Sequence, residues 1–244
     1  MRLDKDAAKK NLLLDRELYT YENGVLRNNF GIMDAEKLRE VERKNSRYVS
    51  ARLLKAKLPD VSLRVMLDIH RKLFSRVYPW AGNVREVNIS KGRTTFADAE
   101  MVAFGCDSIL SSIYSVEHNG YKMSPKEEFC RGIGTAFNML NDIHPFREGN
   151  GRTLRMVVYH IAKNAGWLLD LSKCNREEYM AASIAGCNGY HDGMIHLMQK
   201  NIQPFPDGRV ARNVRMEREK LLAQQPQQQQ SQMSSRRREA YGRV

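Results

Sequence analysis

The sequence has no apolar run that approaches the roughly 18 residues of a membrane-spanning helix, so no bilayer crossing is expected. The first residues, Met1 to Asp6, are charged and lack the apolar core of a secretory signal. Cysteine is sparse: none of the four forms a CxxC pair or has a histidine at zinc-ligand spacing. We therefore predict free thiols in a reducing compartment for Cys106, Cys130, Cys174 and Cys187.

Acidic residues are too few to balance the basic ones, and the formal net charge is +12. Residues 209–244 hold nine Lys/Arg and three Glu, which is half of this excess in a short segment. The remaining 208 residues are only mildly basic, so a nucleic-acid partner is not expected.

Helical periodicity dominates the chain and predicts an all-α fold. Asp34 is placed to cap a helix that runs through Leu54, and Gly166 is placed to end a later one. Further helices are expected near residues 61–76, 98–117, 125–142, 150–165, 175–187 and 191–202. The exception is one small β-hairpin, with residues 84–89 alternating like a strand, a turn at Lys91-Gly92, and residues 94–96 extended again.

The expected domain organisation has four parts. Residues 1–18 form an N-terminal helical lead, and residues 19–205 form the globular domain. Residues 206–223 are expected to extend it as a helix, and the Gln/Arg-rich residues 224–244 to be disordered. The tail has three interpretations: a solvated end, a contact for an acidic partner or nucleic acid, or the start of a longer protein.

The sharpest local feature lies between two predicted helices. Pro145 ends the first helix at His144, and a glycine-rich turn opens the second. A helix N-terminus offers unpaired N–H groups to a phosphate, and the i, i+3 pair Arg152 and Arg155 suits a polyphosphate. Glu148 fits there as a Mg²⁺ ligand, and His144 as a proton acceptor. The alternative for each residue alone is a capped helix with surface arginines.

The segment from His144 to Arg155 resembles the Fic signature HxFx(D/E)GNGRxxR at every fixed position. Two more segments are similar to that family, covering roughly residues 15–205 in all. One is the N-terminal lead between Tyr19 and Ile32. The other runs from Tyr78 through a flap that would dock the target segment by strand addition: Ile89, Ser90, Lys91, Gly92, Arg93, Thr94, Thr95 and Phe96.

The resemblance implies a Fic-type helical bundle that transfers AMP from Mg-ATP to a Ser, Thr or Tyr hydroxyl of a target protein. His144 would be the general base and Glu148 the Mg²⁺ ligand. Asn188 is either a nucleoside contact or a helix cap. The residues expected to contact the nucleotide are Phe146, Gly149, Asn150, Gly151, Arg152, Arg155 and Asn188.

Related Doc kinases carry Lys where this chain has Gly151, which favours AMP transfer over phosphorylation. No segment matches the inhibitory motif (S/T)xxxE(G/N). By resemblance, a small antitoxin is therefore expected to supply a Glu to Arg155. The expected location is the bacterial cytoplasm, or a host cell that receives the protein as an effector. The alternative function is an idle or regulatory module that binds nucleotide and a partner.

Overall fold

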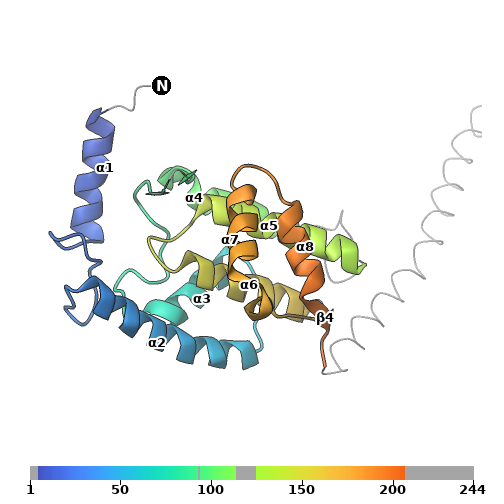
Figure 1. The fold of residues 1–244 in the computed structure, drawn as a ribbon. Helices are drawn as coiled ribbons and strands as arrows, with labels where there is room; N and C mark the ends of the chain where they lie inside the picture. The colour runs from blue at the N-terminus through green and yellow to red at the C-terminus, as the bar shows by residue number, and fades with distance from the viewer. Residues whose placement is uncertain (1–4, 93, 114–124, 207–244) are drawn as a thin grey trace, which may run out of the picture.

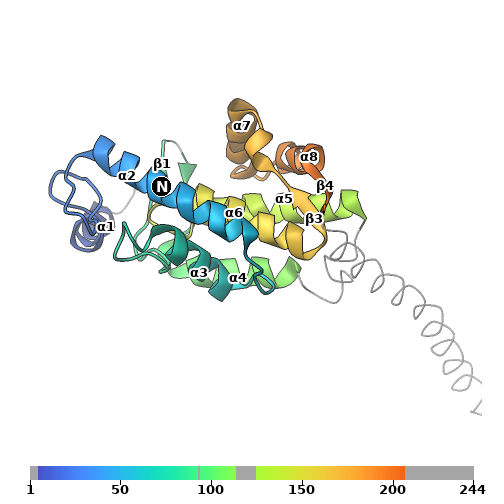
Figure 2. The ribbon, with the colours of Figure 1, turned by 90° about the horizontal axis from the view of Figure 1, so that it is seen from below.

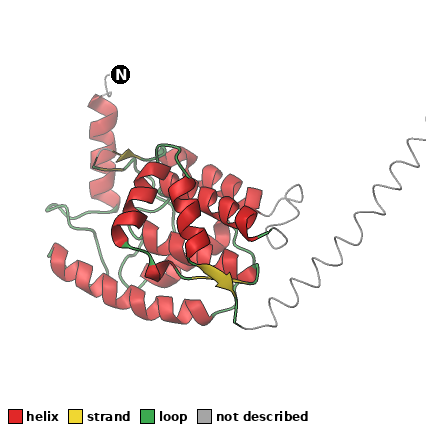
Figure 3. Cartoon of the chain, turned by 45° about the vertical axis from the view of Figure 1, so that its right-hand side comes forward, coloured by secondary structure: helices red, strands yellow, loops and turns green. Residues whose placement is uncertain are grey.

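The computed structural model describes residues 5–92, 94–113 and 125–206. Its described part is mostly helical, as predicted, with very short strands (Figures 1 and 3). The elements are α1 (Lys5–Leu18), α2 (Ala35–Lys55), α3 (Leu63–Phe74), β1 (Ser90–Lys91), β2 (Thr94–Thr95), the 3₁₀ turn η1 (Ala99–Met101), α4 (Val102–Ile113), α5 (Lys126–Ile143), α6 (Asn150–Asn164), β3 (Trp167–Leu169), the 3₁₀ turn η4 (Leu171–Lys173), α7 (Arg176–Gly186), α8 (Asp192–Lys200) and β4 (Ile202–Pro204).

Side-chain caps explain where several helices begin. Asp34 accepts a hydrogen bond from the Lys37 N–H at 2.7 Å, and Asn175 accepts one from Glu177 at 2.7 Å. Such caps satisfy backbone donors that the first helical turn leaves unpaired. The predicted cap at Asp34 is confirmed, and Gly166 lies after α6 with φ +83°, where a helix stop was expected.

Helix α5 lies at the centre of the bundle and packs against α4, α6, α7 and α8. Its buried face includes Phe129, Ile133, Phe137 and Leu140. Helices α2 and α3 pack against α6, while α7 and α8 cover α5 from another side (Figure 2). Each fully buried large side chain contributes about 1.5–3 kcal/mol relative to exposure, so this shared core holds the α5–α6 turn in a fixed place.

The hairpin is shorter than predicted. Ser90 pairs with Thr95 and Lys91 with Thr94, but residues 84–89 do not form a strand. A second antiparallel pair, β3 with β4, joins residues 167–169 to residues 202–204 and was not predicted. It holds the end of the described chain against the end of α6.

Three other predictions concern cysteines, membrane helices and the tail. All four cysteines are free, as predicted. Among the described residues, no helix is both long and apolar enough to cross a membrane. The predictions for residues 114–117 and for the tail beyond Pro206 fall outside the described residues.

Candidate active site

The turn between α5 and α6 places a histidine in a strained backbone conformation. His144 caps α5 with φ 51° and ψ 65°, and in the described chain it is the only non-glycine residue with positive φ. That conformation costs an ordinary residue about 1–2 kcal/mol. Pro145 follows directly and disfavours a continued helix. Strain of this kind is concentrated at functional sites, which supports the choice of this histidine.

The His144 ring is held so that one nitrogen remains available as a base. Nδ1 lies 3.1 Å from the Asn141 carbonyl oxygen, which can only accept, so Nδ1 carries the proton and Nε2 a lone pair. The ring stacks on Phe96 with centroids 3.8 Å apart. Burial lowers the pKa of His144 to about 4, because a charged imidazole loses hydration there. The imidazole is therefore neutral at physiological pH.

The glycine-rich turn behind His144 forms the N-terminus of α6. Gly149 is the N-cap with φ +83°, and a Cβ at this position would overlap the Phe74 ring. Only glycine satisfies both conditions. The unpaired N–H groups and the dipole of α6 then favour an anion at this end of the helix.

Two residues predicted to contact the nucleotide also hold the loop in place. The Phe146 ring is fully buried and stacks on His70 at 3.7 Å, so it cannot reach a ligand. The Asn150 amide accepts from the Phe146 N–H at 2.8 Å and donates to the Phe146 carbonyl at 2.7 Å. In this structure these groups hold the tight turn, and nucleotide contact by either residue stays a prediction.

Glu148 is positioned to serve as the predicted Mg²⁺ ligand. Its Oε1 accepts from the Gly149 N–H at 2.8 Å, while the side chain is 45% exposed. Among the described residues, no group of three or more His, Cys, Asp or Glu could hold a metal. A single carboxylate fits Mg²⁺, which usually takes one or two protein carboxylates together with phosphate oxygens and water.

Arg152 is oriented by a buried acid from another helix. Its Nη2 pairs with Glu42 on α2, and its Nη1 lies 3.1 Å from the Ser46 hydroxyl. Glu42 also accepts from Tyr78, and burial together with this carboxylate raises the pKa of Tyr78. The guanidinium lies 4.7 Å from the centre of the Phe74 ring. The Arg152 side chain keeps 26% exposure, and its Nη2 also lies 3.6 Å from Glu148 Oε1.

Arg155 has a different environment. It lies 5.6 Å from the Tyr179 ring centre and donates weakly to the Tyr179 hydroxyl at 3.4 Å. No ion pair holds it within the described residues. A Cβ at Gly151 would lie 3.3 Å from Arg155 Nη1, so a larger residue there would crowd this guanidinium.

The other predicted contacts are less defined. Asn188 donates to the Ile184 carbonyl at 3.1 Å, which matches its helix-cap interpretation. Ser90, Lys91, Gly92 and Thr95 of the flap are exposed, and Phe96 is turned inward onto His144. Arg93 lies outside the described residues.

Sequence reasoning missed three buried residues that hold the site: Glu42, His70 and Arg85. His70 Nδ1 accepts from the Gly82 N–H at 2.8 Å, so its Nε2 donates to the Glu148 carbonyl at 3.0 Å. Burial lowers the pKa of His70 to about 4. His70 is completely buried in the core. No local motif marks it, because its partners are distant in the sequence.

Together these features define a helical protein with an anion-binding helix N-terminus beside a neutral, oriented imidazole. The Fic/DOC family model matches residues 60–162. Over 167 residues the chain is 32% identical to the probable protein adenylyltransferase y4lH of Sinorhizobium fredii, covering 68% of this chain and 84% of that protein. The chain belongs to the Fic family, as the signature indicated.

Other similarities agree. The protein adenylyltransferase VbhT of Bartonella schoenbuchensis is 35% identical over 188 residues, which cover 75% of this chain. The chain spans only 38% of the length of that relative. The crystal structure of BepC from Bartonella tribocorum with bound AMPPNP has a TM-score of 0.69 at 22% identity, covering 78% of this chain and 97% of that one. This likeness confirms the predicted fold.

Proposed function

We propose that this protein is a protein adenylyltransferase that transfers AMP from Mg-ATP to a Ser, Thr or Tyr hydroxyl of a target protein. The observation that carries the proposal is the juxtaposition of His144, with its free Nε2, and the N-terminus of α6. The relatives named as protein adenylyltransferases support it.

In the proposed reaction, His144 Nε2 accepts the proton of the target hydroxyl. The hydroxyl oxygen forms a bond to the α-phosphorus of ATP, and the bond from that phosphorus to the bridging oxygen breaks. Pyrophosphate leaves with the electron pair. The N–H groups of Asn150 and Gly151, together with Arg152, stabilise the phosphate charge, and Arg155 binds the far end of the triphosphate.

Glu148 would hold the Mg²⁺ that accompanies ATP. When bound, the ion neutralises charge on the phosphate oxygens. The flap would present the target, with its exposed residues pairing with an extended segment. Its inward Phe96 would keep water from His144. The need for ATP implies action inside a cell, either the bacterial cytoplasm or a host that receives the protein.

A transfer assay tests the proposal. With a cell lysate as the source of targets, label from the α-phosphate of ATP should appear on protein and disappear with His144→Ala. His196→Ala is the matched control, because His196 is exposed on α8 and distant in sequence from the turn. Mass spectrometry would identify the modified side chain.

Other outcomes would assign a different function. Label on protein from the γ-phosphate alone would indicate a kinase, which Gly151 argues against. Nucleotide binding without transfer under any condition would indicate the regulatory module instead.

We further propose that a partner protein inhibits the enzyme by placing a carboxylate on Arg155. The absence of an ion pair at Arg155 in the described chain supports this. Expression of the chain alone should be toxic, and co-expression of a genomically adjacent small protein should relieve toxicity. If the chain alone is harmless although active in the transfer assay, no such partner is needed.

A further inference from the structure

Arg85 is a fully buried arginine in the segment that precedes the flap residues 89–96. Its side chain is 1% exposed, yet it forms no ion pair within the described residues. A buried charge needs compensation by hydrogen bonds or by an opposite charge. Here the compensation comes from main-chain carbonyl groups.

The guanidinium binds four carbonyl oxygens from three segments of the chain. Nε donates to His144 at 2.8 Å, and Nη2 donates to Ile143 at 3.0 Å. Nη1 donates to Val87 at 2.7 Å, and Nη2 also donates to Ala97. In addition, the backbone N–H of Arg85 donates to the Pro145 carbonyl at 2.9 Å. Arg85 therefore contacts residues 143, 144 and 145 in succession.

Two of these four carbonyl groups belong to His144 and the residue before it, and the other two flank the flap. His144 is the residue with left-handed backbone, and the Arg85 bonds to Ile143 and His144 fix the peptide units on either side of its α-carbon. Val87 precedes β1, and Ala97 follows Phe96, whose ring stacks on His144. One rigid guanidinium thus fixes the position of the His144 backbone relative to the segment that carries the Phe96 ring.

From this geometry we propose that Arg85 is a positioning residue that holds His144 and the flap in the arrangement required for transfer. It touches neither substrate nor reacting atoms, and the proposal rests on the function proposed above. Because a displacement of about 1 Å can cost about 10²-fold in rate, loss of Arg85 should affect turnover far more than nucleotide binding.

Two variants test the proposal. Arg85→Met removes all four side-chain hydrogen bonds, and Arg85→Lys keeps a charge that cannot reach four carbonyls at once. We expect kcat for AMP transfer to fall about 10²-fold in Arg85→Met and about tenfold in Arg85→Lys, with the Kd for the non-hydrolysable analogue AMPPNP changed less than threefold. Arg27→Met is the control, since Arg27 also donates to a main-chain carbonyl, that of Arg16, but is exposed.

A second readout does not need enzymatic activity. Histidine ¹⁵N shifts report which ring nitrogen carries the proton, and the His144 signals are assigned by their loss in His144→Ala. The wild type should show Nδ1–H alone, and Arg85→Lys a mixture of both tautomers. A single tautomer together with wild-type kcat in a folded Arg85→Lys protein would overturn the proposal. A tautomer change in a chain that never transfers AMP would refute the proposed activity and leave the positioning role intact.

Discussion

At the scale of single residues, the site depends on groups whose roles are set by their neighbours. His144 could act as the proposed base because the Asn141 carbonyl fixes its tautomer and burial keeps it neutral. Asn150 carries the signature's central amide, yet both of its polar atoms bind the Phe146 backbone. The same twelve residues therefore supply both the reactive groups and the bonds that hold the turn.

The pH dependence of transfer should reflect the buried imidazole. Transfer requires neutral His144, whose pKa is lowered to about 4 by burial. Single-turnover rates should therefore stay nearly constant between about pH 5.5 and 8 and fall tenfold per pH unit below about pH 4. An acid limb near pH 6.5, the ordinary value for histidine, would show that His144 is solvated when it acts.

Gly149 should tolerate no side chain. Gly149→Ala would combine a positive φ with overlap on Phe74, and we expect it to lower the free energy of unfolding by about 3 kcal/mol. Gly24→Ala is the matched control, because Gly24 has φ +80° with open space around it, so only about 1–2 kcal/mol should be lost. Urea denaturation measures both values. Equal losses would show that Phe74 moves aside.

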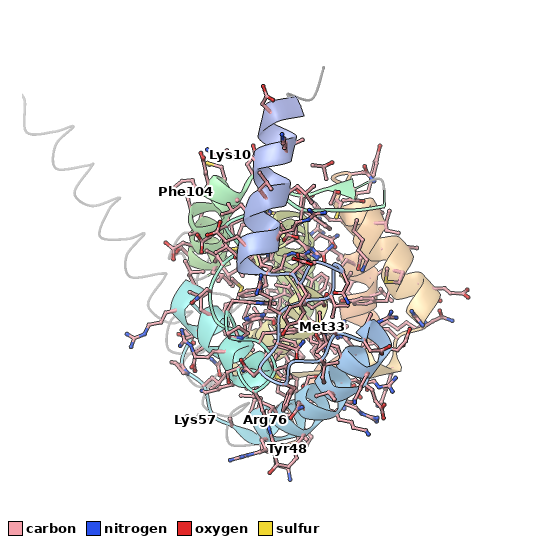
Figure 4. All side chains as sticks on the ribbon, turned by 90° about the vertical axis from the view of Figure 1, so that its left-hand side faces the viewer. Lys10, Met33, Tyr48, Lys57, Arg76 and Phe104 are labelled. Carbon is pink, nitrogen blue, oxygen red and sulfur yellow. The ribbon has the colours of Figure 1, made fainter. Side chains whose placement is uncertain are left out.

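At the scale of elements, α1 is joined to the site by side chains rather than by a large core. It stands away from the bundle in Figure 1, and Lys10 lies on its surface (Figure 4). Asp15 binds Arg147 of the signature through both oxygens, at 2.6 and 3.1 Å. Asn11 pairs with the backbone of Asn88, donating at 2.9 Å and accepting at 2.7 Å.

Removal of the Asn11 amide should loosen the approach to the flap. In Asn11→Ala, the Asn88 N–H loses its acceptor, so its hydrogen exchange should become at least tenfold faster, with about 1 kcal/mol lost in stability. Lys10→Ala on the same helix should leave that exchange unchanged. Unaltered protection of Asn88 in Asn11→Ala would mean that α1 does not hold this segment.

Periodicity predicted the helices because each buries one face over several turns, as α3 and α5 do. The alternating pattern of residues 84–89 predicted a strand, and that prediction is wrong. There Arg85 points inward to bind carbonyls, and Asn88 pairs with the Asn11 side chain instead of with a strand. The β3–β4 pair was missed because three-residue strands carry too little pattern. The signature located the site, but Glu42, His70 and Arg85 act across distant contacts that a single sequence does not reveal.

At the scale of the whole molecule, buried histidines link folding to pH. Burial lowers the pKa of His70, His144 and His160 to about 4. Between about pH 4 and 6.5, the unfolded chain binds protons at these residues that the folded chain does not. Stability should therefore be lost as pH falls through this window, by about 1.4 kcal/mol per pH unit for each histidine.

Denaturation in urea at several pH values measures this linkage. In His160→Phe, the slope of the free energy of unfolding against pH should decrease between pH 4.5 and 6 by about 1.4 kcal/mol per pH unit, which corresponds to one proton. The reason is that His160 is completely buried. An unchanged slope would show that His160 titrates alike in both states.

The β3–β4 pair holds the last described residues against the bundle. Ile202 to Pro204 are bonded to residues 167–169, and β4 lies well apart from β1 (Figure 2). A group attached at Pro206 would therefore lie beside this paired strand and apart from the proposed target-docking flap. A fluorescent label or an affinity handle attached there would leave the proposed docking surface unobstructed, which makes Pro206 a suitable attachment point for immobilising the protein in target-capture experiments.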